Sequence, residues 1–562
     1  MGPLQNSSAL APDRPVPATG FATWNAGFDG KIPVAGALPS LLQRLELPIF
    51  VVGTDRGRRV AVGGTVDMGV GSEAHPLCGY VAPCLPEQLG DPAFCAAHGL
   101  RYAYVAGAMA NGIASEDVVE AMASAGMLAF FGAAGLSPER VERAIDRLQK
   151  NLLDKPFGCN LIHSPNESDL EAAIADLYIR RGVRLVEASA YLRLTLPIVR
   201  YRVHGIHRDA SGAVVAPNKI IAKVSRVEIA QHFFTPPPEK LLAKLVESGD
   251  ITAEQARLAE YIPMAQDVTA EADSGGHTDN RPAIGLLPTL LAFRDQMQAR
   301  HHYAEPLRVG LGGGIATPAS ALGAFAMGAA YVLTGTINQA CVEAGTSDRV
   351  RQMLAEAGPA DVAMAPAADM FEMGVKLQVL KRGTMFAQRA GKLYELYRAH
   401  GDLDAIPAEE RAKLEATVFR KSIDEVWRET KAFFAGRDPR QIERAARDKR
   451  HKMALVFRWY LGQSSNWANA GLEERQMDYQ VWCGPAMGAF NEWVRGSWLE
   501  TPANRRVVDV ARNILYGAAV LQRVNALRQQ GVCIPADAAR VTPLEPNELE
   551  ARLDASLPAG AI

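Results

Sequence analysis

The stretch LRVGLGGGIATPASALGAFAMGAAYVLTGT, residues 307–336, decides the fold class. It contains two short apolar runs, 307–314 and 329–336, each of which carries glycine at its end. The segment between them begins with Pro318 and has the length of a crossover helix, which parallel strands require. Glycines at the start of a helix let backbone amides approach an anion. The stretch therefore predicts a βαβ unit with two glycine turns that can bind phosphate.

The same alternation of apolar runs and helical segments extends upstream from this unit. The further predicted strands are 101–108, 126–133, 156–162, 183–189, 219–225 and 264–273. Eight β/α units over about 240 residues favour a TIM (β/α)8 barrel over a doubly wound sheet. Residues 235–262 predict an extra pair of helices before the sixth strand.

Two other interpretations of the glycine turns compete with phosphate binding. Gly310, Gly312 and Ile315 do not complete the G-x-G-x-x-G fingerprint of a dinucleotide-binding fold, and the sequence has no Walker motif. The glycines could also serve only to make tight turns. The barrel favours phosphate binding, because loops after its seventh and eighth strands commonly hold phosphate.

The composition of the 562-residue chain is that of an ordinary globular protein, with 60 basic and 62 acidic residues and a formal charge of −2. This balance gives no reason to expect nucleic acid or an anionic membrane as the main partner. The start of the chain lacks the pattern of a secretion signal, and no apolar run is long enough to span a bilayer. Seven cysteines without zinc-site spacing predict no metal site and a cytoplasmic location with reduced thiols.

The sequence divides into four predicted regions. Residues 1–98 form an N-terminal segment with a disordered start and a β-hairpin at 47–64, and residues 99–365 form the barrel. Strand signals vanish after about residue 365, so 366–500 is expected to be an α-helical domain for substrate or partner. Within it, 406–436 predicts a helix, and five of the seven tryptophans lie between Trp459 and Trp498. Residues 501–562 are a long helix and a tail.

The stretch EADSGGHTDNRP, residues 271–282, follows the sixth predicted strand. Its glycines, Gly275 and Gly276, let the backbone pass close to a flat ligand, while His277 points into the barrel mouth. A histidine beside a cofactor can transfer a proton near neutral pH or polarise a carbonyl. Most histidines in a chain of this size are structural, and that alternative stays open on spacing alone.

Four stretches together resemble a known family: 102–115, 271–282, 309–340 and 370–397. They look like the trans-acting flavin-dependent enoyl reductases of bacterial polyketide and polyunsaturated fatty acid synthases, which are relatives of nitronate monooxygenases. The resemblance covers most of residues 30–530 and implies an FMN-binding TIM barrel with an additional α-helical domain. It departs from the nitronate monooxygenase pattern E-A-G-G-H-R-G, because Asp273 and Ser274 precede the glycines and Thr278 and Asp279 follow His277.

The resemblance also implies roles for individual residues. The FMN phosphate would be held by Gly313, Gly314, Gly335 and Thr336. The isoalloxazine would lie near Ala108, Met109 and Asn160. Lys223 would contact the flavin or its phosphate side, or serve only as a salt bridge at the barrel end. His277 matches the active-site histidine of the superfamily.

The implied reaction passes hydride from NADPH to FMN and then to the β carbon of an enoyl thioester on an acyl carrier protein. His277 or solvent would supply the proton for the α carbon. Carrier proteins are usually acidic, so the basic residues of 444–452 are either their dock or a solvated helix face. These residues are Arg444, Arg447, Lys449, Arg450 and Lys452.

Four further points stay open at the level of sequence. Trp459, Trp467 and Trp482 could line an acyl channel or belong to a core. The chain could instead be a nitronate monooxygenase or a non-catalytic assembly subunit of a synthase. NADH could replace NADPH, and a homodimer is compatible with the sequence.

Overall fold

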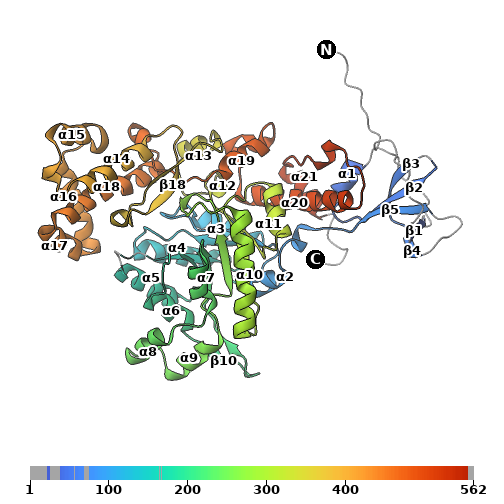
Figure 1. Ribbon diagram of the computed structural model, residues 1–562, viewed down its shortest axis with the longest axis horizontal. Helices are drawn as coiled ribbons and strands as arrows, with labels where there is room; N and C mark the ends of the chain where they lie inside the picture. The colour runs from blue at the N-terminus through green and yellow to red at the C-terminus, as the bar shows by residue number, and fades with distance from the viewer. Residues whose placement is uncertain are drawn as a thin grey trace, which may run out of the picture.

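Eight parallel strands close into a barrel, which confirms the predicted fold class (Figure 1). The computed structural model describes residues 22–25, 38–55, 57–68, 75–163, 165 and 168–554. Each barrel strand pairs with the next along the chain, and the last pairs with the first. The strands are β6 (Tyr104–Ala106), β7 (Leu128–Phe131), β8 (Gly158–Ile162), β9 (Leu185–Ser189), β12 (Lys219–Val224), β13 (Asp267–Glu271), β15 (Arg308–Gly312) and β16 (Val332–Thr334).

Helices between the strands form the outer layer of the barrel. They are α3 (Glu116–Ser124), α4 (Pro138–Leu152), α5 (Ser168–Arg181), α6 (Leu196–Val203), α7 (Val227–Phe234), α10 (Ala283–His301), α11 (Pro318–Ala326) and the short α12 (Thr336–Gln339). Two more, α8 (Glu239–Glu247) and α9 (Ala253–Leu258), lie in the segment where the sequence predicts an inserted pair.

Helix α4 shows how the sequence sets these elements. The Ser137 side chain accepts from the Arg140 N–H and Pro138 occupies the first turn, both of which favour a helix start. The buried face carries Val141, Ala144, Ile145, Leu148 and Leu152 at helical spacing.

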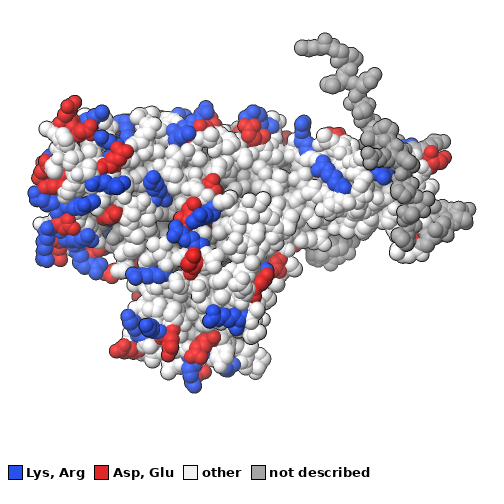
Figure 2. Space-filling view, viewed as in Figure 1, with Lys and Arg blue, Asp and Glu red and all other residues white. Residues whose placement is uncertain are grey.

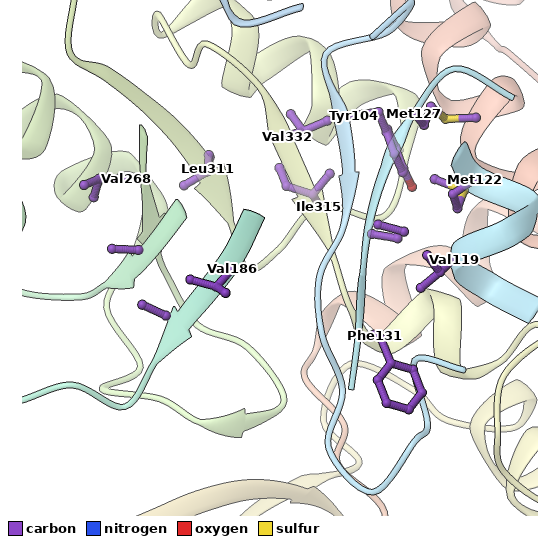
Figure 3. Close-up of a cluster of buried hydrophobic side chains, with 14 of the residues drawn as sticks. Tyr104, Val119, Met122, Met127, Phe131, Val186, Val268, Leu311, Ile315 and Val332 are labelled. Carbon is purple, nitrogen blue, oxygen red and sulfur yellow. The ribbon is translucent and has the colours of Figure 1, made fainter. Parts of the chain in front are cut away.

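Packing of helices against strands makes the main core. Figure 3 shows Val119 and Met122 of α3 beside the barrel strands that carry Tyr104 and Phe131, and all four side chains are buried. Because apolar burial contributes about 25 cal/mol per Å², this layer is the principal source of barrel stability.

A charged cluster ties the opposite, amino-terminal end of the barrel together. The buried Asp267 carboxylate accepts from Arg308 Nε at 2.6 Å and lies 2.9 Å from His98 Nε2. His98 ends helix α2 (Pro92–His98), so this cluster also fixes that helix under the barrel.

A small antiparallel sheet at the barrel mouth contradicts the prediction that strands end at about residue 365. β17 (Val362–Pro366) pairs with β18 (Lys376–Leu380), and β18 also pairs with the two-residue β14 (Gly276–His277). The loop after the sixth barrel strand is therefore joined to a segment about a hundred residues further on, as long-range strand pairing allows.

The helical region contains α14 (Phe386–Ala399), α15 (Ala408–Lys413), α16 (Ile423–Arg437), α17 (Pro439–Arg447), α18 (Lys449–Ala470) and α19 (Ala486–Val494). Helices α14 to α18 lie at the left of Figure 1, whereas α19 lies nearer its centre, beside α12 and α13 (Asp348–Ala355). The single helix predicted over 406–436 is wrong. A π-helix at Leu414–Phe419 ends at Arg420, which has φ of 52°, and Ser422 caps a new helix.

The five tryptophans of 459–498 divide between two cores. Trp459 and Trp482 pack on the core of the helical region, Trp493 and Trp498 pack against the barrel cluster, and Trp467 contacts both.

The N-terminal strands form a separate sheet at the right of Figure 1: β1 (Ala22–Asn25), β2 (Ile49–Thr54), β3 (Gly57–Val62), β4 (Thr65–Met68) and β5 (His75–Val81). β2 and β3 are the predicted hairpin. The predicted disordered start lies outside the described residues.

Helix α20 (Val507–Gln529) is the predicted long C-terminal helix and lies between the N-terminal sheet and the barrel. Its Arg523, fully buried, donates to the carbonyls of Leu42, Arg44 and Leu47, next to the short helix α1 (Leu38–Leu42). Helix α21 (Pro546–Asp554) follows. Among the described residues, no helix combines the length and apolar character needed to cross a membrane.

Candidate active site

The glycine turns after β15 and β16 line one cavity at the carboxyl end of the barrel. Gly313 and Gly314 have φ of 86° and 78°, a conformation that glycine adopts without strain. A Cβ at Gly313 would meet the backbone of Ala272 at 2.7 Å, whereas at Gly314 and Gly335 it would meet no atom within 4 Å. The turn therefore packs closely on one side and is open toward the cavity on the other.

Polar groups in this cavity have hydrogen-bonding capacity to spare. Over the described part of the chain, the backbone N–H groups of Gly313, Gly314 and Gly335 donate to no protein acceptor. The Ser274 hydroxyl is buried, lines the same cavity and also has no partner. Because buried polar groups are almost always hydrogen-bonded, the set is suited to a polar ligand.

Close backbone contact builds the cavity wall beside Ser274. A Cβ at Gly275 would lie 2.9 Å from the Cys483 nitrogen, and one at Gly484 would lie 2.8 Å from the Gly275 nitrogen. The Gly484 N–H donates to Thr336 Oγ1 at 3.2 Å. The two glycines thus allow the loop after β13 to contact a segment from the end of the helical region.

Lys223 lies between two carboxylates at the barrel mouth. Its Nζ is 3.3 Å from Glu271 and 3.7 Å from the fully buried Glu187. Burial opposes the charge on Lys223, but Glu271 and Glu187 outweigh burial and raise the pKa of Lys223 above its ordinary range. Burial raises the pKa of Glu187, an effect that Lys223 and the Ala108 N–H partly offset. Lys223 is therefore a cation fixed at the junction of two cavities.

A second, larger cavity of about 490 Å³ adjoins the first and lies between the barrel and the helical region. The two share Ala108, Met109, Lys223, Glu271, Gly275 and Trp482. Helices α16 and α18 contribute Phe433, Phe434, Leu455 and Trp459 to its wall. Its size and its largely apolar lining with a few polar groups are typical of a small-molecule site.

His277 projects into this larger cavity from β14. Its Nε2 lies 3.1 Å from Asp369 Oδ1, and the two side chains are 32% and 28% exposed. Burial opposes protonation of His277, but Asp369 outweighs burial, and the pKa of His277 is raised. Burial raises the pKa of Asp369, but the neighbouring His277 outweighs burial, and the pKa of Asp369 is lowered. The pair favours an imidazolium beside a carboxylate.

The sequence-predicted site residues lie around these two cavities. Gly313, Gly314, Gly335 and Thr336 line the first, Asn160, Gly276 and His277 line the second, and Ala108, Met109, Lys223 and Gly275 line both. The Asn160 amide is fixed by donation to the Glu187 carbonyl and to Ser189 Oγ. Of the three candidate channel tryptophans, Trp459 and Trp482 line the larger cavity, whereas Trp467 lines neither and packs against Arg475.

The basic residues of 444–452 lie away from both cavities, on α17 and the start of α18. Lys449 forms an ion pair with Asp402 at 2.6 Å, Arg450 stacks on Tyr397 and Lys452 on Trp427. Figure 2 shows basic side chains interleaved with acidic ones at this end of the molecule, so the cluster is a mixed surface.

Sequence reasoning missed Asp369, Glu187, Glu271 and Ser274 as site residues. Glu271 and Ser274 belong to the quoted motif around His277, at the end of a predicted strand, so their position is a signal that could have found them. Glu187 lies inside the predicted strand 183–189, where a carboxylate in an apolar run is the only signal. Asp369 has no such signal, because the pairing of β14 with β18 brings it to the site.

Comparison with known proteins agrees with this architecture. Residues 93–390, more than half of the chain, match the nitronate monooxygenase family. The chain belongs to that family. Within it, the solved enoyl reductase domain of MlnA, from the macrolactin biosynthesis cluster of Bacillus amyloliquefaciens, is 40% identical with a TM-score of 0.74. The match covers 79% of this chain and 99% of that domain, which confirms the enoyl reductase branch expected from the four motifs.

Two similar proteins are longer than this chain. A polyunsaturated fatty acid synthase protein of Thraustochytrium sp. is 49% identical over 455 residues, which are 80% of this chain and 30% of that protein. Polyketide biosynthesis protein PksE of Bacillus subtilis is 44% identical over 446 residues, 79% of this chain and 58% of that protein. The chain thus spans less than two thirds of these relatives.

The helical region has its own match. Residues 400–479 match the inserted helical domain of [acyl-carrier-protein] S-malonyltransferase. This match covers α15 to α18, of which α16 and α18 line the larger cavity.

Proposed function

We propose that the chain is an FMN-dependent enoyl reductase that acts in trans on enoyl thioesters of acyl carrier proteins during polyketide or polyunsaturated fatty acid synthesis. The observation that carries the proposal is the junction of the two cavities. A glycine cradle suited to phosphate opens at Ala108 and Met109 into an apolar chamber with His277 on its wall.

The residues present fit FMN. Unpartnered N–H groups of Gly313, Gly314 and Gly335, the open space over Gly314 and Gly335, and the buried Ser274 hydroxyl suit a phosphate and its ribityl chain. Thr336 would join the phosphate contacts. Ala108, Met109, Asn160, Gly275 and Gly276 would lie around the ring system, with Lys223 at its edge.

When bound, FMN would accept hydride from NADPH and deliver it to the β carbon of the enoyl thioester. The chain's own residues orient the substrate and handle the proton. The apolar walls from α16 and α18 exclude water from the acyl chain, and His277 protonates the α carbon or polarises the thioester carbonyl.

We extend the proposal to the carrier protein. Arg437 lines the larger cavity at the end of α16, and α17 begins at Pro439. The basic residues of α17 and of the start of α18 are Arg444, Arg447, Lys449, Arg450 and Lys452. An acidic carrier would be steered by this surface toward the cavity. Charge reversal of Arg444 and Arg447 should raise KM for a carrier-bound substrate about tenfold at low salt and leave KM for a short thiol mimic unchanged.

The test is a visible spectrum of the protein after FMN reconstitution, followed by anaerobic addition of NADPH and then of a crotonyl thioester. The proposal requires that the flavin bleaches with NADPH and recovers its colour when the thioester is added without oxygen. Reoxidation only by oxygen with turnover of nitroalkanes would instead assign nitronate monooxygenase activity. A colourless protein that takes up no FMN would identify a non-catalytic assembly subunit.

A further inference from the structure

Asp369 comes from a part of the chain that no motif connects with His277. It lies in the loop between β17 and β18, and β18 pairs with β14, the strand of His277. His277 is opposite Leu377 and Gly276 is opposite Gln378 in that pairing. The two members of the pair are therefore held by one small sheet at the wall of the larger cavity.

From this geometry we propose that Asp369 is the positioning residue of a histidine–carboxylate dyad, in which it orients the His277 ring and keeps it in the protonated form. Asp369 contacts Nε2 at 3.1 Å, so an ionised carboxylate requires a hydrogen on that nitrogen. The proton that leaves during the reaction then comes from Nδ1. The inference rests on the proposed reductase function for its chemical step.

Proton transfer from His277 accompanies hydride transfer in the proposed reaction. Hydride adds to the β carbon, the Nδ1–H bond of His277 breaks, and a C–H bond forms at the α carbon. The imidazole is left neutral with its remaining hydrogen on Nε2, still bonded to Asp369, and water returns the proton after product leaves. Asp369 stays ionised throughout and does not touch the substrate carbon.

The surroundings of the pair support this assignment. Gln378 of β18 donates to Asp273 Oδ1 at 2.8 Å and to the Ser274 carbonyl at 2.9 Å, so the loop that leads to His277 is hydrogen-bonded to the sheet. His277 on β14 and Asp369 in the connection between β17 and β18 are thus held at one small sheet, and such support is what a precise proton donor requires.

Three charged groups face the dyad from the elements packed around it. Within the dyad Asp369 favours the protonated ring, Glu271 on β13 favours it as well, and Lys223 on β12 opposes it. Arg458 on α18 lines the same cavity and favours the ionised form of Asp369. Asp369 has the largest effect of these neighbours, and its removal should lower the pH at which His277 loses its proton.

The test measures the protonation of His277 directly on the full chain, without substrate. Diethyl pyrocarbonate acylates neutral imidazole, and mass spectrometry of the His277 peptide gives its acylation rate at each pH. Asp369→Asn and Asp369→Ser should both shift the midpoint of this rate to lower pH, and Asp369→Glu should restore it toward that of the parent protein. Asp295→Asn, an exposed carboxylate on α10, is the matched control and should change nothing.

Steady-state turnover with NADPH and a crotonyl thioester gives the second readout. Asp369→Asn should lower kcat by roughly 10- to 100-fold, with KM within about twofold, and should move the alkaline fall of kcat to lower pH. Unchanged acylation midpoints in both neutral variants would overturn the dyad, whatever the activity. Normal acylation shifts in a protein that does not reduce enoyl thioesters would retain the dyad and reject the proposed function.

Discussion

The glycines of the first cavity differ in what an added Cβ would meet, and this difference distinguishes an effect on ligand binding from an effect on folding. At Gly335 an added Cβ meets no protein atom within 4 Å and enters the first cavity. We expect Gly335→Ala to weaken FMN binding about tenfold, because the methyl occupies space that the phosphate needs, which is about 1.4 kcal/mol. Flavin fluorescence titration measures the change.

The control for this prediction is Gly323→Ala in α11, where an added Cβ also meets no atom but lies outside both cavities. That variant should bind FMN as the parent does. Equal affinity of the Gly335 variant and the parent would show that the phosphate lies elsewhere.

Lys223 has a structural effect as well as a place in the site. Lys223→Met should destabilise the protein by about 3 kcal/mol, because it leaves the buried Glu187 without its cation. The double variant Lys223→Met with Glu187→Gln should recover most of this loss, since the buried charge is then absent. Urea unfolding of the two variants and of Glu187→Gln forms the cycle, and additive losses would contradict the coupling.

Among single residues, His277 was predictable from sequence and Asp369 was not. His277 follows two glycines directly after a predicted strand, a local pattern that sequence displays. Asp369 stands in PAADMFEM, where nothing local distinguishes it from a surface carboxylate. Asp369 reaches His277, which lies 92 residues earlier in the chain, because β14 pairs with β18.

At the scale of elements, the charged cluster of Asp267, Arg308 and His98 at the amino-terminal end of the barrel predicts that the free energy of unfolding depends on pH in acid. Burial raises the pKa of Asp267, but His98 and Arg308 outweigh burial and hold this pKa at about 2. A carboxylate whose pKa is lowered on folding stabilises the fold above its unfolded pKa near 4. This contribution, about 2 kcal/mol, should be lost as the pH falls from about 4 to 2.

Asp267→Asn should remove this part of the acid dependence and lower stability at neutral pH, where Arg308 loses its partner. Urea unfolding between pH 2 and pH 7 is the measurement. Asp117→Asn, at an exposed carboxylate, serves as control. If the free energy of unfolding of the Asp267 variant depends on pH as it does in the parent protein, the proposed role of the charged cluster is contradicted.

Helices and strands were predictable from sequence where their own residues carry a clear hydrophobic pattern. Each barrel strand is a buried run bounded by polar or glycine-bearing turns, and eight of them in order specify the barrel. β18 has the sequence KLQVL, and its identity as a strand depends on pairing with β14 and β17. The break at Arg420 carries neither glycine nor proline. The capping box formed by Ser422 and Glu425 is the residue pattern that marks the start of the next helix, and the sequence prediction did not use it.

At the scale of the whole molecule, α20 holds the N-terminal sheet on the barrel. Arg523→Met should release that sheet, because three carbonyls near α1 lose their donor at about 1–3 kcal/mol for each unpaired group. Limited proteolysis should then cut faster near residues 43–47, while FMN affinity stays unchanged. Arg528→Met, at an exposed residue of the same helix, is the control. Equal cleavage rates for the Arg523 variant and the parent protein would contradict this role of Arg523.

The contact between Gly275 and Gly484 has a consequence for the order of synthesis. The ribosome completes the last barrel strand at Thr334. The Gly484 N–H, which donates to Thr336 Oγ1, belongs to a residue that is added 148 positions after Thr336. A nascent chain can thus fold a complete barrel while one wall of its reaction chamber is still untranslated. The wall of the first cavity is complete only after that segment is made, so a protein shortened before residue 484 would be a barrel with an open side.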